Sequence, residues 1–578
     1  MDIMNLFLIT HPAASVSRGI EAIVIKGRNS KSLVVQSGCA LLSRAISVSI
    51  FPVFLLLELT FKRVPKLIFS LRNPEKRWQK FDKIVKYALG ILSSPLGLYS
   101  PDGPSGLFLK SPHLANAVCP FGVEHKYGIT MQDILFPTTK EALQVMIKEA
   151  KREGFQVSII GAGMSQGTQT VPINKQQTVI NTKYLKKITF AKDKKTVCVQ
   201  SGATWEELQL ELDKIGKSAI VKQASDLFSI GGSIGINCHG WAHTYGAIAS
   251  SVKELTIIDA KGDVKTLRPE DEQFGCMFGT LGYFGVIVDA TLEIVDNEYL
   301  VEKTQEVSID EFIQAYAEIK KKDNVPLFGG RLVLDSLDGN PLRTVCMVSF
   351  EKDASREGAK TPPISKEPKW GTRLERIGLK LFSHLPNFSA QRLISWFWKK
   401  EKIRMFQEKK LTRNEALHPP INAFKMLHNS HLHTQWLQEF FIKEENLPTF
   451  LDYLGAQLKA NGVRLINATI RPTPQDRISI LPYAEQKRHA VVISFSQLKT
   501  EEAMKETQKW IENVTNFAIR NGDIYYQAYM PFATREQFEA CYTKERVENL
   551  RTLKQKYDPE HLFGNAHTKK YFDAQESI

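Results

Sequence analysis

Apolar residues in this chain follow helical spacing in some segments and form short strand-like runs in others. Residues 133–154 begin with a short apolar run, stop at a proline and continue with a helical pattern. Thr138 and Glu141 stand three residues apart, as in a capping box. The core-facing positions of this predicted helix are Leu143, Met146 and Ala150. The segment therefore predicts a strand followed by an amphipathic helix.

The same alternation continues downstream. A predicted strand at 196–200 precedes a helix that opens on a Thr204–Glu207 capping box and directs Leu208, Leu212 and Ile215 inward. A strand at 253–260 turns at 261–263 into a partner, and Gly279, Gly282 and Gly285 precede an apolar strand at 286–295. These elements predict an α+β domain.

Residues 228–246, FSIGGSIGINCHGWAHTYG, place several glycines inside an apolar run that is typical of a buried strand. Glycine weakens a strand and is usually kept where a ligand or another backbone comes close. Asn237 and His239 supply polar groups inside the run. Two interpretations remain open from this segment alone: a ligand site, or a glycine-rich loop whose histidine is simply hydrogen-bonded.

A second glycine-rich segment favours the ligand site. Residues 156–170, QVSIIGAGMSQGTQT, run from an apolar strand at 157–160 into a turn whose backbone N–H groups can bind phosphate oxygens. The third glycine comes one residue late for a Rossmann fingerprint, and Thr182 and Lys183 provide no ribose-binding acid. The P-loop lysine is also missing. The segment therefore predicts a phosphate-bearing cofactor held by a different fold.

Four motifs in order resemble the FAD-binding domain of the vanillyl-alcohol-oxidase, or PCMH-type, flavoprotein family: GAGMSQG, SGATWEEL, SDLFSIGGSIGINCHG and GTLGYFGVIVDATLEIV, over roughly residues 125–298. The final KYDPEHLFGNAHTKKYF resembles the closing segment of aldonolactone oxidases and of the decaprenylphosphoryl-ribose oxidase. The resemblance implies an α+β fold with a PCMH-type FAD-binding domain at 111–298 and an α+β cap domain at 299–515. It also implies a C-terminal segment at 516–578 that closes the active site, after an N-terminal extension at 1–110.

The resemblance also implies which residues bind FAD. The pyrophosphate would be cradled by Gly161, Ala162, Gly163, Met164, Ser165 and Gln166. The flavin and diphosphate would be lined by Ser229, Gly231, Gly232, Ser233, Gly235, Asn237 and His239, and contacted by the backbone of Val286. Met164 occupies the position of the histidine that many members link to FAD, and Trp241 and Ala242 replace the cysteine of a second link. Noncovalent FAD is therefore predicted.

Three residues are predicted to be catalytic: His239, Arg471 and Lys570. The imidazole of His239 can accept a substrate hydroxyl proton as hydride leaves, or it can merely hydrogen-bond the flavin or a backbone carbonyl. Arg471 matches the arginine of the lactone oxidases' Glu-x-Arg pair and can stabilise an anionic flavin or an oxyanion, but Thr469 replaces the acid. That replacement puts sugar-lactone oxidation in doubt.

Other polar residues of the predicted cap domain and C-terminal motif each have two interpretations. Gln438 and Glu439 supply polar contacts to the site, or Glu439 is a solvated edge residue. From the C-terminal motif, Asn565, Lys569, Lys570 and Tyr571 return to the mouth of the active site, where lysine is a substrate ligand or surface charge. Cys238 is more typical of a small buried apolar residue than of a nucleophile.

Composition narrows the choice of partners. The 578 residues carry 76 basic and 62 acidic side chains, hence a net charge of +14, without a nucleic-acid-binding motif. Lipid or phosphate-bearing partners are therefore preferred. Seven cysteines without CxxC pairs indicate a reducing compartment. His428, His431 and His433 are spaced loosely and lack an accompanying acid or cysteine, so no metal site is predicted.

Two segments predict contact with a membrane surface. Residues 45–57 are apolar but too short to span a bilayer, and a basic stretch follows them. Within a basic insertion at 359–410, residues 372–404 interleave aromatic side chains with arginine and lysine. The alternatives are a helix packed on the enzyme and aromatic side chains buried in the cap. We expect a cytoplasmic protein, peripheral or anchored at the membrane.

The sequence therefore predicts an FAD-dependent oxidoreductase. It would oxidise a CH–OH group of a sugar-, polyol- or lipid-linked substrate by hydride transfer to flavin and pass electrons to oxygen or a membrane acceptor. The alternatives are a sterol-type C=C reductase of the same family and a non-catalytic flavin-fold protein that binds membranes or partners.

Overall fold

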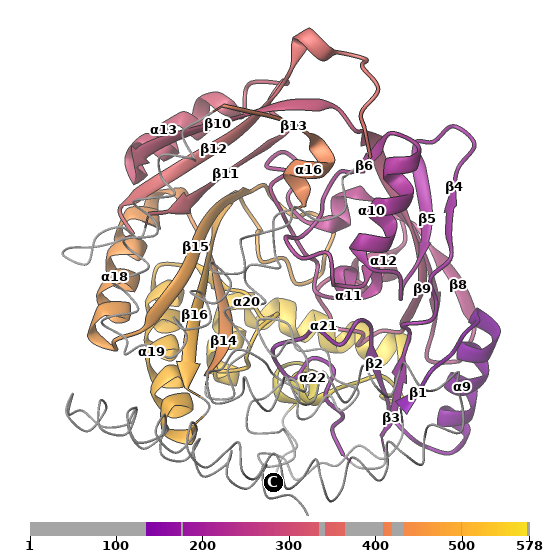
Figure 1. Ribbon diagram of the computed structural model, residues 1–578. Coiled ribbons are helices and arrows are strands. Elements are labelled where there is room, and N and C mark those ends of the chain that lie inside the picture. Colours follow the sequence, from indigo (N-terminus) through magenta and orange to yellow (C-terminus); the bar gives the residue numbers. More distant parts are fainter. Residues whose placement is uncertain are drawn as a thin grey trace, which may run out of the picture. The chain divides into compact units, whose positions relative to one another are not determined.

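The computed structural model describes residues 134–174, 177–333, 342–363, 408–418, 433–498 and 500–574. Nearly all of them belong to one compact unit, composed of residues 108–369, 391–421 and 435–578. The described residues form three sheets with helices packed against them, so the predicted α+β class is confirmed (Figure 1).

The first sheet is small, parallel and ordered β1-β3-β2. Its elements are β1 (Ile134–Leu135), α9 (Lys140–Arg152), β2 (Val157–Ile160) and β3 (Thr178–Asn181). Helix α9 begins one residue later than predicted: its N-cap is Thr139, whose hydroxyl accepts from the Ala142 N–H at 3.1 Å. The Thr138–Glu141 capping box was therefore wrong. A start at Lys140 directs Leu143, Ile147 and Ala150 into the core and leaves Met146 only partly buried.

The second sheet has the order β4-β5-β9-β7-β8, with β6 also paired to β9. Its strands are β4 (Ile188–Phe190), β5 (Thr196–Gln200), β6 (Lys217–Ala219), β7 (Val252–Ile258), β8 (Val264–Leu267) and β9 (Val286–Asp296). The intervening helices are α10 (Trp205–Lys214), α11 (Ile230–Gly235), η4 (Ile248–Ser251) and α12 (Glu272–Gly275). The predicted Thr204–Glu207 capping box is present at the start of α10.

The apolar run after Ser229 is a short helix, α11, and not a strand. Ser229 caps it, because its hydroxyl accepts from the Gly232 N–H at 3.3 Å. A serine at this position favours a helix start over extended backbone. The strand-like pattern of Ile230, Ile234 and Ile236 was therefore misleading.

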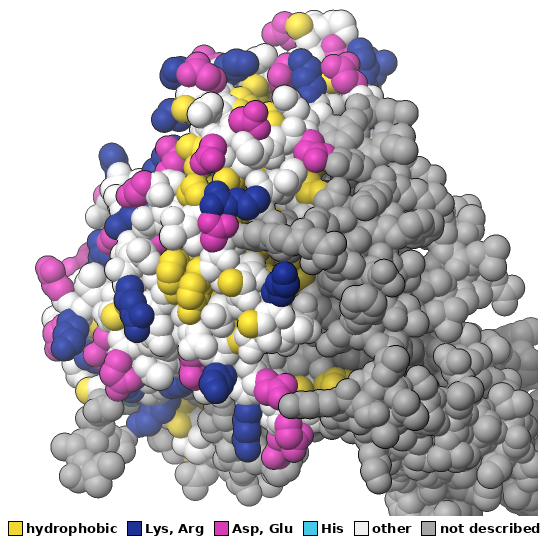
Figure 2. All heavy atoms as spheres, turned by 90° about the vertical axis from the view of Figure 1, so that its left-hand side faces the viewer, with side chains coloured by type: hydrophobic (Ala, Val, Ile, Leu, Met, Phe, Trp, Pro, Cys, Tyr) yellow, Lys and Arg dark blue, Asp and Glu magenta, His cyan; other side chains and the backbone are white. Residues whose placement is uncertain are grey.

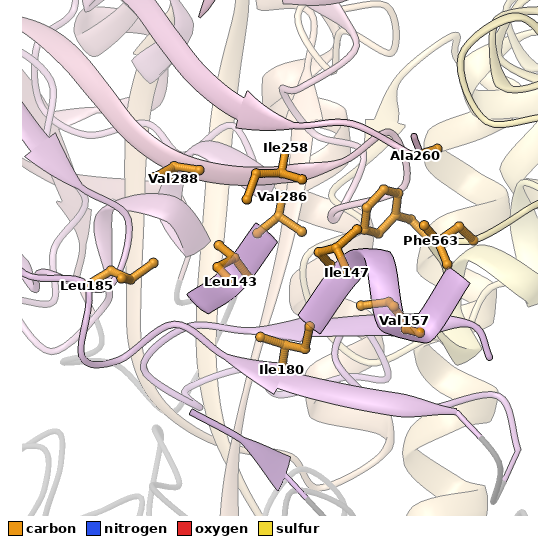
Figure 3. Close-up of a cluster of buried hydrophobic side chains, with 12 residues drawn as sticks. Leu143, Ile147, Val157, Ile180, Leu185, Ile258, Ala260, Val286, Val288 and Phe563 are labelled. Atoms are coloured by element: carbon orange, nitrogen blue, oxygen red, sulfur yellow. The ribbon is translucent and has the colours of Figure 1, made fainter. Parts of the chain in front are cut away.

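The C-terminal segment completes the core of this half of the molecule. Figure 3 shows Phe563 packed with Val157 and Ile147, which come from β2 and α9. The Val157 N–H donates to the Leu562 carbonyl at 2.6 Å, and the Gly564 N–H donates to the Val157 carbonyl at 3.1 Å. Residues about 400 positions apart are thus joined along one strand edge. Helices α20 (Arg535–Tyr542) and α21 (Lys544–Tyr557) precede these residues, and α22 (Ala566–Tyr571) follows them.

The third sheet has eight strands in the order β13-β10-β12-β11-β15-β16-β14-β17. These are β10 (Tyr299–Ser308), β11 (Leu327–Leu332), β12 (Thr344–Lys352), β13 (Lys409–Thr412), β14 (His433–Ile442), β15 (Arg464–Thr473), β16 (Arg488–Leu498) and β17 (Ile524–Tyr525). Strand β15 ends at Thr473, since Pro472 and Pro474 lack the N–H groups that a continuing ladder needs. The chain leaves the second sheet at Asp296 and enters the third at Tyr299.

Helices cover one face of the eight-stranded sheet. Helices α13 (Ile309–Ile319), α18 (Leu447–Ala460) and α19 (Glu501–Arg520) lie along the same side of it in Figure 1. Phe440 of β14 contacts Phe450 of α18, with ring centroids 5.3 Å apart. The shorter elements are η5 (Ala354–Arg356), α16 (Arg413–Leu417) and η6 (Glu444–Asn446). The predicted boundary at 515/516 falls inside α19.

The surface seen in Figure 2, which is the left-hand side of Figure 1, intersperses basic and acidic side chains around small hydrophobic patches. Its described part thus shows no continuous basic face. Within the described ranges, no helix is long and apolar enough to cross a membrane. The extension at 1–110, including the apolar stretch at 45–57, and the insertion at 372–404 lie outside the described residues, as do His428 and His431 and the side chain of His433.

Candidate active site

The two glycine-rich segments meet at the side chain of Ser229. Its hydroxyl accepts from the backbone N–H groups of Ala162 (3.2 Å) and Gly232 (3.3 Å). A Cβ on Gly161 would lie 2.0 Å from the same oxygen, so only glycine fits there. The loop after β2 and the start of α11 therefore lie against each other at Ser229.

Glycines of α11 leave open space beside this junction. A Cβ on Gly235 would meet no atom within 4 Å, and one on Gly232 would approach only the Ser229 hydroxyl, at 3.0 Å. Gly232 is exposed, and Gly161 and Ala162 are partly exposed. Gly231 differs, because a Cβ there would lie 2.6 Å from the side chain of Ser201. Gly235 is thus a glycine that no protein neighbour explains, as expected where a ligand approaches.

The other predicted cofactor residues lie beneath this open strip. Met164, Ser233, Asn237 and Val286 are buried, and Ser233 accepts from the Trp205 indole N–H at 2.9 Å. Asn237 adopts φ +52° and donates to an Asp476 carboxylate oxygen at 2.8 Å. Gln166 accepts from the backbone N–H of Leu437 in β14 at 2.9 Å. These residues shape the region, while the open backbone of the two loops offers the contacts.

Buried polar atoms without a protein partner surround the same loops. Within the described part of the chain they include Thr168 Oγ1, Gln169 Oε1, Thr170 Oγ1 and Ser201 Oγ. Buried hydroxyl and amide oxygens normally have a hydrogen-bond partner. Together with the open glycines, they fit a cofactor that is rich in phosphate, ribose and ring polar groups.

Two glycine variants distinguish a glycine that is needed for cofactor binding from one that is needed for packing within the protein. Gly235→Ala should leave the melting temperature of the flavin-free protein unchanged or slightly raised, because alanine favours a helix and meets no neighbour. It should weaken FAD binding at least tenfold, measured by fluorescence titration. Gly240→Ala is the control: its Cβ would lie 2.1 Å from the Lys222 carbonyl, so it should lower the melting temperature. Unchanged FAD affinity in Gly235→Ala would place the cofactor elsewhere.

His239 lies in a hydrogen-bonded row of three side chains. Its Nε2 is 2.5 Å from Glu439 Oε1, and the Tyr529 hydroxyl donates to Glu439 Oε2 at 3.2 Å. His239 and Glu439 are 5% and 2% exposed, whereas Tyr529 is partly exposed. Burial and the neighbouring carboxylate of Glu439 raise the pKa of Tyr529 well above its usual value, so the phenol stays a donor. Glu439 is thus a buried partner of the predicted histidine and not a solvated edge residue.

The eight-stranded sheet, called the cap sheet below, holds the His239–Glu439–Tyr529 row in place. Glu439 and Phe441 alternate along β14 on the same face, and the Phe441 ring lies 5.3 Å from the His239 ring. Tyr526 donates to the Ile236 carbonyl at 2.6 Å, and Tyr483 donates to the Asn237 carbonyl at 2.8 Å. Cap side chains therefore fix the backbone of the segment that carries His239. Gln438 lies on the opposite face of β14, with Phe440.

Arg471 lies on β15, next to Glu439 in space. Burial lowers the pKa of Arg471, the Glu439 carboxylate opposes this shift, and the positive charge of Arg331 adds to it. Its guanidinium carbon is 5.7 Å from the centre of the Trp241 ring. The structure thus brings together the predicted residues His239 and Arg471 around Glu439.

Comparison with known proteins identifies the cofactor. Residues 132–268, which include both glycine-rich segments, match the sequence model of a family described as FAD binding domain. The chain carries a PCMH-type FAD-binding domain. The predicted family and the predicted cofactor, FAD, are therefore confirmed.

Relatives of this flavoprotein extend the comparison. It is 23% identical to Berberine bridge enzyme-like 27 of Arabidopsis thaliana, over 89% of this chain and 96% of that protein. It is 26% identical to the L-gulonolactone oxidase of Bos taurus, over 31% of this chain and 40% of that enzyme. It is 27% identical to the D-arabinono-1,4-lactone oxidase of Kluyveromyces lactis, over 31% and 35% respectively. The two lactone oxidases therefore match over well under half of their length.

Two residues of the C-terminal motif, Lys570 and Asn565, donate hydrogen bonds to main-chain carbonyls. Lys570 Nζ donates to the carbonyls of Pro531 (2.6 Å) and Ala533 (2.8 Å), and Asn565 donates to the Leu281 carbonyl at 3.0 Å. The amine of Lys570 is thus bound to main-chain oxygens. A role in binding substrate remains a prediction that these contacts do not support.

Sequence reasoning missed Tyr529, Arg331 and the contribution of Trp241. The FGGRL run of β11 contained a signal, because Gly329 accommodates the Trp241 ring: a Cβ there would lie 2.6 Å from it. Paired glycines inside a strand often mark such close approach. For Tyr529 the sequence contains no comparable pattern, since its partner Glu439 is 90 residues away.

Proposed function

We propose that this flavoprotein oxidises a CH–OH group of a sugar-, polyol- or lipid-linked substrate. The observation that carries the proposal is the His239–Glu439–Tyr529 row, which reaches from two buried side chains to a partly exposed tyrosine. Removing hydride from an alcohol also requires a group that takes the hydroxyl proton. The row provides such a group beside the loops that fit FAD.

Bound FAD would supply the hydride acceptor, and the side chains would accept the proton of the substrate hydroxyl. The Tyr529 oxygen receives the substrate proton while its own proton passes to Glu439 Oε2. With the ring proton on Nε2, His239 donates to Glu439 Oε1 and holds the carboxylate in position. The proton acceptor is then the imidazole–carboxylate pair, whereas the sequence suggested the imidazole alone. Arg471, on which the Glu439 carboxylate acts, adds a positive charge beside this row.

The test is anaerobic reduction of the purified, FAD-loaded protein by a panel of alcohols, polyols and sugars, followed as bleaching of the flavin absorbance. Reduction by an alcohol, with formation of the carbonyl product, is the expected result. A protein that is colourless and cannot be reconstituted with FAD would contradict the enzyme proposal. The relatives named as lactone oxidases make aldonolactones part of the panel, although Thr469 replaces the family's acid.

Attachment of the flavin can be tested separately. Met164 is a buried thioether where many family members carry the linking histidine, so the flavin should be noncovalent. Acid precipitation should release all yellow colour into the supernatant, as measured by absorbance of both fractions. Colour that remains in the pellet would show a covalent link at another residue.

A further inference from the structure

We propose that Arg331 and Arg471 bind an oxyanion carried by the substrate, a phosphate or carboxylate group remote from the reacting alcohol. This inference deepens the proposed function, since it names the substrate class of the same site. It rests on the placement of two unneutralised guanidinium groups on one face of the cap sheet.

The register of β11 and β15 puts the two arginines on the same face. Arg331 pairs directly with Thr469, and Gly330 pairs with Ile470. Side chains directly opposite each other share a face, and so do residues two positions apart on one strand. Arg331, Thr469 and Arg471 therefore project together. The opposite face is occupied by helices, because a Cβ on Gly330 would approach Phe312 of α13.

Among the described residues, neither guanidinium forms an ion pair or a hydrogen bond. Arg471 Nε and Thr469 Oγ1 are buried without a partner, and the charged groups that act on Arg471 include the Glu439 carboxylate and Arg331. Glu439 is already bonded to both His239 and Tyr529. The carboxylate that acts on Arg471 is therefore already engaged, and the second cation, Arg331, adds positive charge beside it. Buried or partly buried charges are normally paired, so this excess positive charge points to an anionic ligand.

Geometry favours an oxyanion over other anions. Guanidinium groups present parallel N–H donors that match the oxygens of carboxylate and phosphate, and the Thr469 hydroxyl adds a further donor. Both arginines and Trp241 are partly exposed, so a ligand can reach them. The Trp241 ring lies against Gly329, between the arginine face and the segment that carries His239. A substrate held there by its anion would direct its hydroxyl toward Tyr529.

The experiment compares the FAD-loaded wild type with Arg331→Gln. Inorganic phosphate and acetate are titrated against the flavin absorbance spectrum, and flavin reduction is measured with glycerol and glycerol 3-phosphate as a matched pair. In the wild type, phosphate or acetate should perturb the spectrum and compete with substrate. Arg331→Gln should weaken that binding at least tenfold while the flavin content stays unchanged.

Arg356→Gln is the control, because it removes one exposed cap arginine that lies over the Tyr299 ring and should leave anion binding intact. The proposal is overturned if the wild type binds neither anion or if Arg331→Gln binds both as the wild type does. A second comparison measures the Arg331-dependent binding of two probes, glycerol 3-phosphate and vesicles of phosphatidylglycerol. Binding of the first shows recognition of a soluble phosphate ester, and binding of the second shows recognition of a lipid headgroup. Failure of every alcohol to reduce the flavin, with Arg331-dependent anion binding retained, would refute the proposed oxidation and leave the anion site standing.

Discussion

Glu439→Gln should slow flavin reduction by about 10²- to 10³-fold, the range typical of losing a general acid–base group. Glutamine has nearly the same shape and can still meet the Tyr529 hydroxyl, so the fold and the flavin content should persist. What it lacks is the carboxylate that receives the proton and pairs with His239 Nε2. The measurement is single-turnover reduction of bound FAD by stopped-flow absorbance.

Two further variants make this result interpretable. Tyr529→Phe removes the hydroxyl that receives the substrate proton and passes its own to Glu439, so it should lower the same rate by a comparable factor. Glu444→Gln replaces another carboxylate of the cap, one bound to Lys487 and His489, and should reduce flavin at the wild-type rate. Reduction by Glu439→Gln at the wild-type rate would show that the row does not carry the substrate proton.

Lys554→Met should destabilise the protein by about 3–5 kcal/mol, the cost of removing one partner from a buried ion pair. Lys554 is 1% exposed and its amine donates to Asp558 Oδ2 (2.7 Å) and to the carbonyls of Tyr283 (2.6 Å) and Phe563 (2.7 Å). Methionine preserves the volume but leaves the fully buried Asp558 carboxylate without its cation. The measurement is denaturant unfolding followed by tryptophan fluorescence.

Lys556→Met provides the matched control. This lysine lies two residues further along the same helix and pairs with Glu272 at an exposed site, where ion pairs contribute little. Its unfolding midpoint should stay close to that of the wild type. Equal midpoints for the two variants would mean that the Lys554 contacts do not fasten the C-terminal segment to the FAD-binding half.

Local elements were predictable where neighbouring residues decide them. The Thr204–Glu207 capping box, strand β2 and strand β5 appear as the pattern indicated, because hydrogen bonds and side-chain alternation within a few residues specify them. Errors occurred where local signals competed. Thr138 and Thr139 both suit an N-cap, and burial of Ile147 selected the second. The glycines that follow Ser229 are compatible with either a helix or a strand, so the apolar pattern alone did not exclude α11.

The cofactor could also be predicted from the sequence. Phosphate recognition by backbone N–H groups needs glycines at fixed spacing in one continuous stretch, so the two loops could be read without a fold. The identity of the cofactor followed from the order of the motifs and the family match. By contrast, no local pattern could show that Ser229 joins the two loops, since that contact spans 67 residues.

By itself, the sequence determined the α+β class and the FAD-binding domain, and it made His239 and Arg471 candidate site residues. Only the tertiary structure decided what those two residues do, because their partners come from strands far along the chain. Glu439 lies 200 residues beyond His239, and Arg331 meets Thr469 only through the register of β11 and β15. A pattern in sequence records which side chains share a face of one element. Which faces meet, and which charges are left without a partner there, depends on how the sheets pack.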